Sequence, residues 1–253
     1  PYQKACYNDA LQFLRNAEPG QRRFYVSPTG TGKSVIELML HEELHDSWIV
    51  TPTIEIIDGM RDKLGREPRA MTPIKLRNRL LSGEIDPPRY LIFDEGHHSE
   101  ADTWQSIMLL CGMAPAVGFS ATGFRGTPKS TKQFLDFWGE PIHVMTYKQA
   151  IDRNYIKFPS ISFLPLVDDD SIDIVNGEFE VTRLEEETRD RLEDLAVHAK
   201  QWFDGHSWDR PTVFSLPTRQ TCREFVRICA KYDLPMFTIA ANTSREDRLL
   251  IFH

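Results

Sequence analysis

A glycine-rich loop near the amino end of the 253-residue chain carries the first residues with a clear chemical role. It reads Ser27-Pro28-Thr29-Gly30-Thr31-Gly32-Lys33-Ser34 and lies between an expected strand and an expected helix. Glycines let backbone N–H groups approach a polyphosphate, and a helix amino terminus favours anions. The lysine can reach β- and γ-phosphates, and the serine can bind Mg²⁺. The strict pattern has glycine where Ser27 stands, and alone the loop is also compatible with a structural turn.

A pair of acids follows the apolar segment Tyr90–Phe93, in the string Asp94-Glu95-Gly96-His97-His98. Carboxylates at the carboxyl end of a parallel strand lie where open α/β sheets bind ligands. Asp94 could hold Mg²⁺ through water, and Glu95 could polarise an attacking water, as phosphoryl transfer requires. An isolated acid pair is also compatible with a solvated turn. A position about sixty residues after a phosphate loop favours the functional interpretation.

Short apolar segments alternate with helical patterns around these motifs, which predicts an α/β domain with a mainly parallel sheet. The expected strands are Phe24–Val26, Trp48–Thr51, Tyr90–Phe93 and Val117–Ser120. The expected helices are Lys33–His45, Pro73–Leu81, Asp102–Leu110 and Thr131–Phe137. These elements predict a first domain over residues 1–146, and a short helix is expected after it at Tyr147–Arg153.

A different pattern follows, which predicts a connector over residues 147–210 with an acidic helix at Thr182–Phe203. The α/β rhythm then restarts with a strand at Thr212–Ser215, a helix at Arg219–Tyr232 and a strand at Met236–Ile239. We therefore expect residues 211–253 to begin a second domain of the same kind.

The composition is that of an ordinary globular protein, with 41% hydrophobic and 26% charged residues. It excludes wholesale disorder and a fibrous architecture. No stretch approaches the roughly 20 apolar residues that span a bilayer, and the polar start has no signal-peptide core. We expect a soluble protein in the cytoplasm or another intracellular compartment, without a membrane partner. The four cysteines lack a C-x-x-C pair, so we expect buried thiols rather than a zinc site.

The net charge of −7 is unevenly distributed. Residues 168–194 hold twelve acids against three arginines, which predicts a solvated hinge and helix face, with partner recruitment as the alternative. Residues 61–80 hold seven bases against two acids. This basic run is a candidate phosphate-facing surface, although a solvated basic face would look the same.

Taken together, the motifs resemble those of superfamily 2 helicases of the D-E-x-H branch. The string S-P-T-G-T-G-K-S is similar to motif I, D-E-G-H-H to motif II and Ser120-Ala121-Thr122 to motif III. The resemblance implies RecA-like domains, ATP and Mg²⁺ as cofactors, and ATP hydrolysis coupled to nucleic acid. It implies catalytic roles for Lys33, Asp94, Glu95 and His97, with Ser34 and Asp94 as the metal-binding residues.

Further segments extend the resemblance over most of the chain. Pro1-Tyr2-Gln3 is similar to the upstream glutamine element, which implies that Gln3 reads adenine. Thr51-Pro52-Thr53 resembles motif Ia and Thr72-Pro73 resembles motif Ib, which implies nucleic-acid contacts there and at Arg77 in the basic run.

Motif III has its own variant form. The segment Gly118–Arg125 is similar to the T-A-T-P-x-R form of type III restriction subunits and related duplex-DNA translocases. This similarity implies that Ser120, Ala121, Thr122 and Arg125 couple the ATP site to nucleic acid. It favours DNA as the partner, with RNA as the alternative.

The resemblance ends early. Thr212–Ser215 resembles motif IV, but nothing after Phe214 matches motif V or VI. We expect either a native reading frame that continues past His253 or a protein partner that supplies the missing arginine. Two other functions stay open: a translocase motor of a restriction or defence complex that does not unwind, and a nucleotide-dependent protein-interaction switch.

Three competing patterns favour structural interpretations. His41-Glu42-Glu43-Leu44-His45 matches H-E-x-x-H, but it lacks a clear third metal ligand and occupies the helix after the phosphate loop. For His97, coupling by hydrogen bonds is favoured over metal binding. The aromatic residues at helical spacing are expected in the core rather than stacked on bases: Trp104, Phe134, Phe137 and Trp138.

Overall fold

The computed structural model describes residues 2–98, 102–123, 128–157, 174–175, 178–205, 212–239 and 243. The chain forms two compact units, residues 1–159 and 160–253. None of the helices in these ranges is long and apolar enough to cross a lipid bilayer. The first unit takes in the segment just after residue 146, where the predicted first domain ends, and the predicted three-part division stays a prediction.

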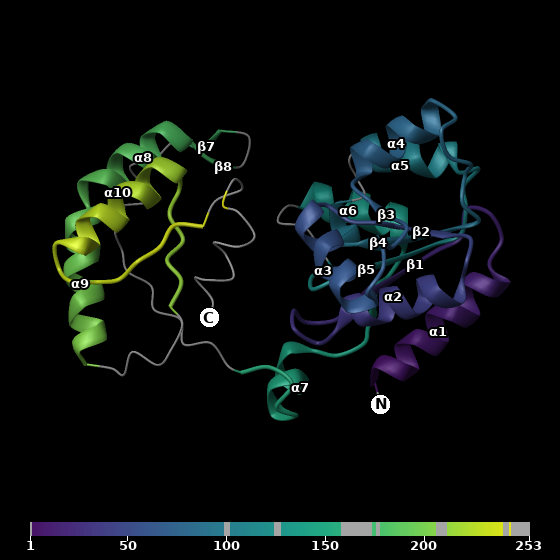
Figure 1. The fold of residues 1–253 in the computed structure, drawn as a ribbon, viewed down its shortest axis with the longest axis horizontal. Coiled ribbons are helices and arrows are strands. Elements are labelled where there is room, and N and C mark those ends of the chain that lie inside the picture. The colour runs from purple at the N-terminus through teal and green to yellow at the C-terminus, as the bar shows by residue number, and fades with distance from the viewer. Residues whose placement is uncertain are drawn as a thin grey trace. The chain divides into compact units, whose positions relative to one another are not determined.

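The first unit is built on a six-stranded sheet in the order β3-β2-β4-β5-β1-β6 (Figure 1). Every pairing in this sheet is parallel. The strands are β1 (Arg22–Val26), β2 (Ser47–Val50), β3 (Ala70–Met71), β4 (Tyr90–Asp94), β5 (Ala116–Ser120) and β6 (Ile142–His143). The sheet confirms the predicted α/β, RecA-like class.

Helices cover both faces of this sheet (Figure 1). They are α1 (Tyr2–Asn16), α2 (Lys33–Glu43), α3 (Ile54–Leu64), α4 (Pro73–Leu81), the 3₁₀ turn η1 (Gly96–His98), α5 (Asp102–Leu110), α6 (Pro128–Trp138) and α7 (Tyr147–Asp152). The predicted helices of this unit are confirmed, with their ends shifted by a few residues. The sequence did not predict α1, α3, β3 or β6.

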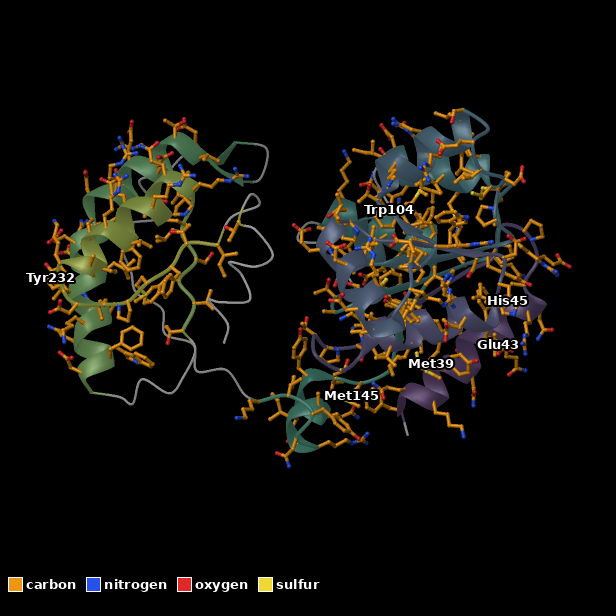
Figure 2. All side chains as sticks on the ribbon, in the orientation of Figure 1. Met39, Glu43, His45, Trp104, Met145 and Tyr232 are labelled. Carbon is orange, nitrogen blue, oxygen red and sulfur yellow. The ribbon has the colours of Figure 1, made fainter. Side chains whose placement is uncertain are left out.

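Alternate residues of each strand enter two different cores, as the two-residue period of a strand requires. In β4, Ile92 packs in the core formed with α1, α2 and α3, whereas Leu91 and Phe93 pack in the core formed with α4, α5 and α6. Both cores exclude water almost completely. Trp104, labelled in Figure 2, is 4% exposed, and Phe134 and Trp138 are buried with it, as predicted, whereas Phe137 is only partly buried against this core.

Gly118 in β5 is a tight point of the second core. A Cβ atom at this position would lie 2.6 Å from Phe24 Cδ2 and 2.9 Å from Trp138 Cη2. We predict that Gly118→Ala lowers the free energy of unfolding by about 1–3 kcal/mol, because overpacking displaces both rings. Urea unfolding followed by circular dichroism measures the change, and Gly59→Ala on α3, where a Cβ would meet no atom within 4 Å and φ is not positive, is the open-space comparison. Equal losses in both variants would contradict this packing argument.

The second unit contains three helices and a hairpin among its described residues. They are α8 (Val181–Asp190), α9 (Leu192–Asp204) and α10 (Arg219–Ala230), with β7 (Ile174–Val175) antiparallel to β8 (Glu178–Phe179). Its core joins α9 to α10 through Leu195, Phe203, Phe225 and other apolar side chains.

The sequence predictions for this unit are partly wrong. The single helix Thr182–Phe203 is two helices, because Arg191 leaves helical geometry between them. The segments Thr212–Ser215 and Met236–Ile239 form no strand, and no neighbouring strand pairs with them in the described part. Val213 is 85% exposed and Phe237 is 68% exposed, so neither segment is covered as an interior strand would be. A second RecA-like sheet therefore stays a prediction.

Candidate active site

The phosphate loop runs from the end of β1 into α2. Gly30 and Gly32 have φ angles of 82° and 87°, in the left-handed region that glycine tolerates best. Ser27, where the strict pattern has glycine, is 3% exposed, and its hydroxyl lies 2.6 Å from the Thr31 hydroxyl. Thr31 in turn donates to the Pro28 carbonyl at 2.6 Å. Ser27, which stands where the strict pattern has glycine, thus closes the loop through these side-chain hydrogen bonds.

Lys33 begins α2 and is only 9% exposed. Its Nζ donates to the Ser27 carbonyl at 3.3 Å, across the mouth of the loop. Ser34 follows on the first turn of the helix and is half-buried. The loop is fixed to the sheet because Ser27 N donates to the Ser120 carbonyl of β5 at 3.0 Å.

Asp94 ends β4, two strands away from β1 in the sheet. It is 4% exposed and accepts hydrogen bonds from Thr51 Oγ1 at 3.2 Å and from Glu95 N at 3.0 Å. Burial and the neighbouring Glu95 charge raise the pKa of Asp94. Thr51 is fully buried, so its hydroxyl belongs to this acidic site rather than to the surface.

Glu95 lies in a hydrogen-bonded triangle with His97 and Ser120. Its Oε2 accepts from Ser120 Oγ at 2.8 Å and lies 3.2 Å from His97 Nδ1. His97 Nδ1 lies 2.7 Å from the same hydroxyl, which also accepts from Thr122 N at 3.2 Å. Burial alone would raise the pKa of Glu95, but the hydrogen bonds from His97 and Ser120 and the Lys33 charge lower it overall.

The backbone of Glu95 is also unusual. Its φ of 47° is a left-handed conformation that residues other than glycine seldom adopt. Such strained positions cluster at functional sites. The next residue, Gly96, is fixed by α6, because Trp138 Nε1 donates a hydrogen bond to the Gly96 carbonyl at 3.1 Å. The strain thus aims the Glu95 side chain back toward the end of β5.

The amino end of α1 lies over the phosphate loop. Gln3 Nε2 donates to the Thr31 carbonyl at 3.1 Å, and the Tyr2 hydroxyl donates to the same oxygen. The Tyr2 ring lies 5.0 Å from the Tyr155 ring, centroid to centroid. Ile156 faces Gly30, where a Cβ would meet its Cγ2 at 3.4 Å. Segments from both ends of the first unit therefore flank the loop.

The remaining predicted site residues are spread more widely. Pro52 and Thr72 are half-buried and Thr53 is exposed, each at or near the start of a helix. Arg77 is half-buried on α4, and its Nε atom is buried without a hydrogen-bond partner among the described residues. Ala121 is half-buried and Thr122 is exposed, whereas Arg125 lies outside the described residues. The nucleic-acid role of these residues stays a prediction.

Glu37 is a site residue that sequence reasoning missed. It is 0% exposed on α2, where its carboxyl group is within hydrogen-bonding reach of the carboxyl group of Asp94. Burial and the Asp94 charge raise the pKa of Glu37 well above its usual range, while the Lys33 charge opposes them. Its spacing could have indicated this place, because residue 37 follows Lys33 by one helical turn and so lies on the same face of the helix.

The H-E-x-x-H segment is structural. His41 is 5% exposed, with Nδ1 lying 2.9 Å from Ser47 Oγ and Nε2 accepting from Arg69 N at 3.3 Å. His45 is exposed at the outer end of α2 (Figure 2). Both ring nitrogens of His41 are therefore occupied, and the described His, Cys, Asp and Glu side chains form no metal-holding group of three.

Because the His41 imidazole is buried, we predict that the free energy of unfolding decreases at acidic pH. Burial and the charges of Arg66 and Arg69 lower the pKa of His41 from 6.5 to about 4. Between these pH values the unfolded chain binds a proton that the folded chain excludes, so stability falls as the pH drops from 6.5 to 4. We predict a loss of up to about 3 kcal/mol over this window from His41 alone. His41→Gln should flatten the pH dependence of urea unfolding, whereas His45→Gln should leave it unchanged.

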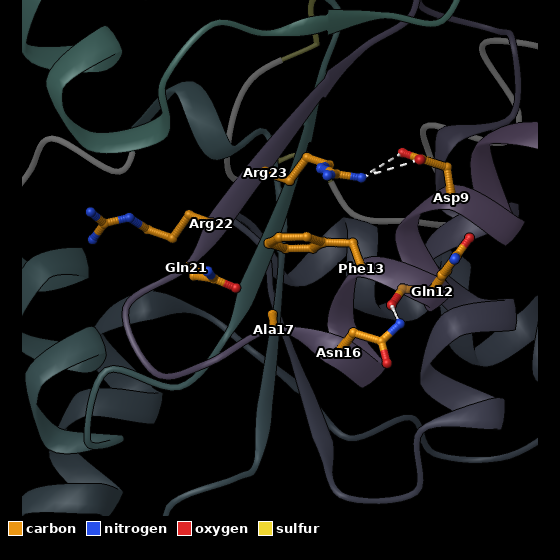
Figure 3. Close-up of a pocket in the computed structure, with 8 residues that line it drawn as sticks. All are labelled: Asp9, Gln12, Phe13, Asn16, Ala17, Gln21, Arg22 and Arg23. Atoms are coloured by element: carbon orange, nitrogen blue, oxygen red, sulfur yellow. Dashed lines mark hydrogen bonds and ion pairs between the residues drawn. The ribbon is translucent and has the colours of Figure 1, made fainter.

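A separate pocket of about 640 Å³ lies at the opposite, amino end of β1 (Figure 3). It is lined by α1 and by the start of β1: Asp9, Gln12, Phe13, Asn16, Ala17, Gln21, Arg22 and Arg23. Arg23 is paired with Asp9 at 3.1 Å and lies over the Phe13 ring. Because the phosphate loop follows the other end of the strand, this pocket is not part of the candidate active site.

Comparisons with known proteins found partial similarities. No family model matches the chain. A 51.5 kDa protein of a Lactococcus phage (isolate 7-9) is 28% identical over 163 residues, which is 60% of this chain and 35% of that protein. The match therefore spans about a third of the phage protein.

Two solved structures are similar in part. The Pyrococcus furiosus Hef helicase domain has 17% sequence identity and a TM-score of 0.48, over 91% of this chain and 52% of that one. A nuclease-deletion mutant of the Type ISP restriction-modification enzyme LlaGI, solved with a DNA substrate mimic, has 12% identity and a TM-score of 0.43. It is matched over 81% of this chain and 24% of its own.

Proposed function

We propose that the chain is an ATP-hydrolysing motor of the superfamily 2 type, which acts as a helicase or translocase on nucleic acid. One observation carries the proposal: the loop before Lys33 and the Asp94–Glu95 pair meet at the carboxyl edge of the sheet, where Ser120 accepts from Ser27 N and donates to Glu95. Ligands of open α/β sheets bind at this edge. The combination of a phosphate loop with a strand-terminal acid pair is the one that phosphoryl transfer uses.

The residues fit ATP with Mg²⁺. Gly30 and Gly32 adopt left-handed φ angles, and the missing Cβ of Gly32 makes room for the Gln3 side chain, since a Cβ there would lie 2.2 Å from Gln3 Nε2. Ser34 and Asp94 would hold Mg²⁺, which neutralises phosphate charge when bound. The backbone of residues 28–32 would cradle the phosphates together with Lys33. Gln3, beside the loop, would read the adenine.

Glu95 is the residue we assign to activation of the attacking water. Its lowered pKa keeps it a carboxylate at neutral pH, as a group that orients and polarises water must be. Ser120 and His97 fix the orientation of this carboxylate through the hydrogen bonds described above. The same Ser120 hydroxyl accepts a hydrogen bond from Thr122 N, which would link the position of the Glu95 carboxylate to motif III.

The nucleic-acid surface would include Thr53, Thr72 and the basic run on α3 and α4, with contacts to phosphates rather than bases. DNA is the partner we favour. Steady-state ATP hydrolysis with Mg²⁺, measured alone and with single-stranded DNA, duplex DNA or RNA, tests the proposal. We expect stimulation by DNA. Hydrolysis that no nucleic acid changes would favour a nucleotide-dependent switch, and no ATP binding at all would overturn the phosphate-loop assignment.

A further inference from the structure

The first half of β1, residues 22–24, forms an open edge of the main sheet. On one side, β1 pairs with β5 along its whole length, from Arg22 to Val26. On the other side, β6 pairs with Tyr25 and Val26 and does not reach Arg22, so the described residues place no strand there. An unpaired strand edge offers backbone N–H and C=O groups to a further strand.

The backbone of Arg22 points to this open edge. The N–H and C=O groups of successive residues in a strand point alternately to the two neighbouring strands. The Gln21 carbonyl accepts from Ala116 N of β5 at 3.1 Å, whereas the Val26 carbonyl accepts from Val144 N on the β6 side at 2.9 Å. Arg22 is four residues before Val26 and therefore faces the same side. Its N–H and C=O groups are available to a new strand in the part of the chain that the structure describes.

The pocket at the amino end of β1 straddles the open edge (Figure 3). Successive side chains of a strand point to opposite faces of a sheet. Both Arg22 and Arg23 line the pocket, and they extend to opposite sides of β1 in Figure 3. A pocket that both side chains line must lie at the edge of the strand rather than on one face. Its volume of about 640 Å³ is within the range of ligand-binding sites.

The two arginines differ in charge balance. Arg23 is paired with Asp9, whereas Arg22 lies over the Phe137 ring at 4.2 Å and has no ion pair with a described carboxylate. Arg22 is also half-buried, and burial lowers its pKa. A charged side chain that only protects a strand edge from pairing stays in water. Because Arg22 is partly withdrawn from water without a counter-ion, its guanidinium favours an incoming carboxylate.

We propose that the open edge of β1 binds an extended segment of a partner protein, which adds to the sheet as a further strand and carries a carboxylate side chain for Arg22. In this mode of recognition, main-chain hydrogen bonds give affinity and side-chain contacts give specificity. The side chains of the added strand alternate, so a residue next to the carboxylate would lie on the side of Phe13. The proposal is independent of the proposed ATP site, which lies at the carboxyl end of β1.

A synthetic peptide tests the proposal. The probe is a dye-labelled, amidated heptapeptide in which valine and glutamate alternate, and fluorescence anisotropy measures its binding without nucleotide. We expect saturable binding to the wild-type chain and about tenfold weaker binding to Arg22→Gln, because a charge-assisted hydrogen bond is lost. Arg89→Gln is the matched control, since Arg89 also lies over an aromatic ring but does not line this pocket. It should bind the peptide as the wild type does, and circular dichroism checks that both variants are folded.

Peptide variants test the same contacts on the unaltered protein. Lysine in place of glutamate should abolish binding, and proline in place of the central residue should do so as well, because proline cannot donate to a strand ladder. No binding of the glutamate peptide up to about 1 mM, or equal binding of the lysine peptide, would overturn the proposal. Binding that proline leaves unchanged would exclude strand addition. If sedimentation shows a wild-type dimer that Arg22→Gln dissociates, a second copy covers the edge and the partner assignment is wrong.

Discussion

Glu95→Gln is expected to stop ATP turnover while ATP still binds. Glutamine keeps the size of the side chain and can still accept the Ser120 hydrogen bond, but it loses the charge that polarises water. Loss of a positioned general base costs typically 10²–10⁴-fold, so we expect turnover to fall by about this factor. Phosphate release measures the rate, and binding of a fluorescent ATP analogue measures the affinity.

A matched control separates this effect from a general loss of acidity. Glu43→Gln removes a carboxylate from the exposed Arg15 pair in the same unit and should leave turnover unchanged. If Glu95→Gln retained turnover within a few-fold of the wild type, another residue would have to activate the water. The triangle with His97 and Ser120 would then serve only to hold the end of β4.

Lys33→Ala is expected to abolish both nucleotide binding and turnover. Lys33 is buried at the mouth of the loop, where its ammonium faces Asp94, Glu95 and the predicted phosphate position. Removing one preorganised donor from a water-excluded site costs about 10²–10³-fold in rate. We expect at least this loss, because the remaining carboxylates would also repel the phosphates. Equilibrium binding and phosphate release are measured side by side.

Folding must be checked in the same experiment, since the lysine also offsets buried negative charge. Circular dichroism melting of Lys33→Ala gives this check, and Lys132→Ala, an exposed lysine on α6, is the comparison for a general loss of positive charge. Wild-type ATP binding by a folded Lys33→Ala chain would show that the loop holds something other than a nucleotide.

The sheet of the first unit was predictable where strands are long and central. β1, β2, β4 and β5 have continuous apolar runs because both faces of a parallel sheet are covered. β3 and β6 have only two residues each, too few for a period to show. α1 was missed because its buried positions are Cys6, Ala10 and Leu14, two of them small or weakly apolar.

The second unit was less predictable because strand formation depends on a partner. The β-branched and aromatic residues at 212–215 and 236–239 have strand propensity, but propensity describes how well a residue fits a pleated, half-buried surface. No neighbour supplies that surface in the described part of this unit. Helix α10 was predicted correctly, because its own apolar period is strong enough to mark it.

The candidate site was predictable through its motifs but not through its burial pattern. Lys33, Asp94 and Glu95 follow from the spacing of glycines, lysine and strand-terminal acids. Glu37 does not, because a glutamate in an amphipathic helix normally faces solvent. On α2 the pattern is mixed: Val35 and Met39 are 41% and 43% exposed, while Glu37 and His41 are buried together with Ile36, Leu38 and Leu40. The sequence alone does not show which of these residues face inward.

The contacts of Tyr2 and Gln3 with the loop, and of Tyr155 with Tyr2, join the beginning and the end of the first unit at the proposed nucleotide site. A shortened chain that starts after Gln3 or stops before Tyr155 would retain every residue of motifs I, II and III. It would nevertheless open one side of the phosphate loop to solvent. We therefore expect the smallest version of this unit that binds nucleotide to include these contacts as well as the motifs.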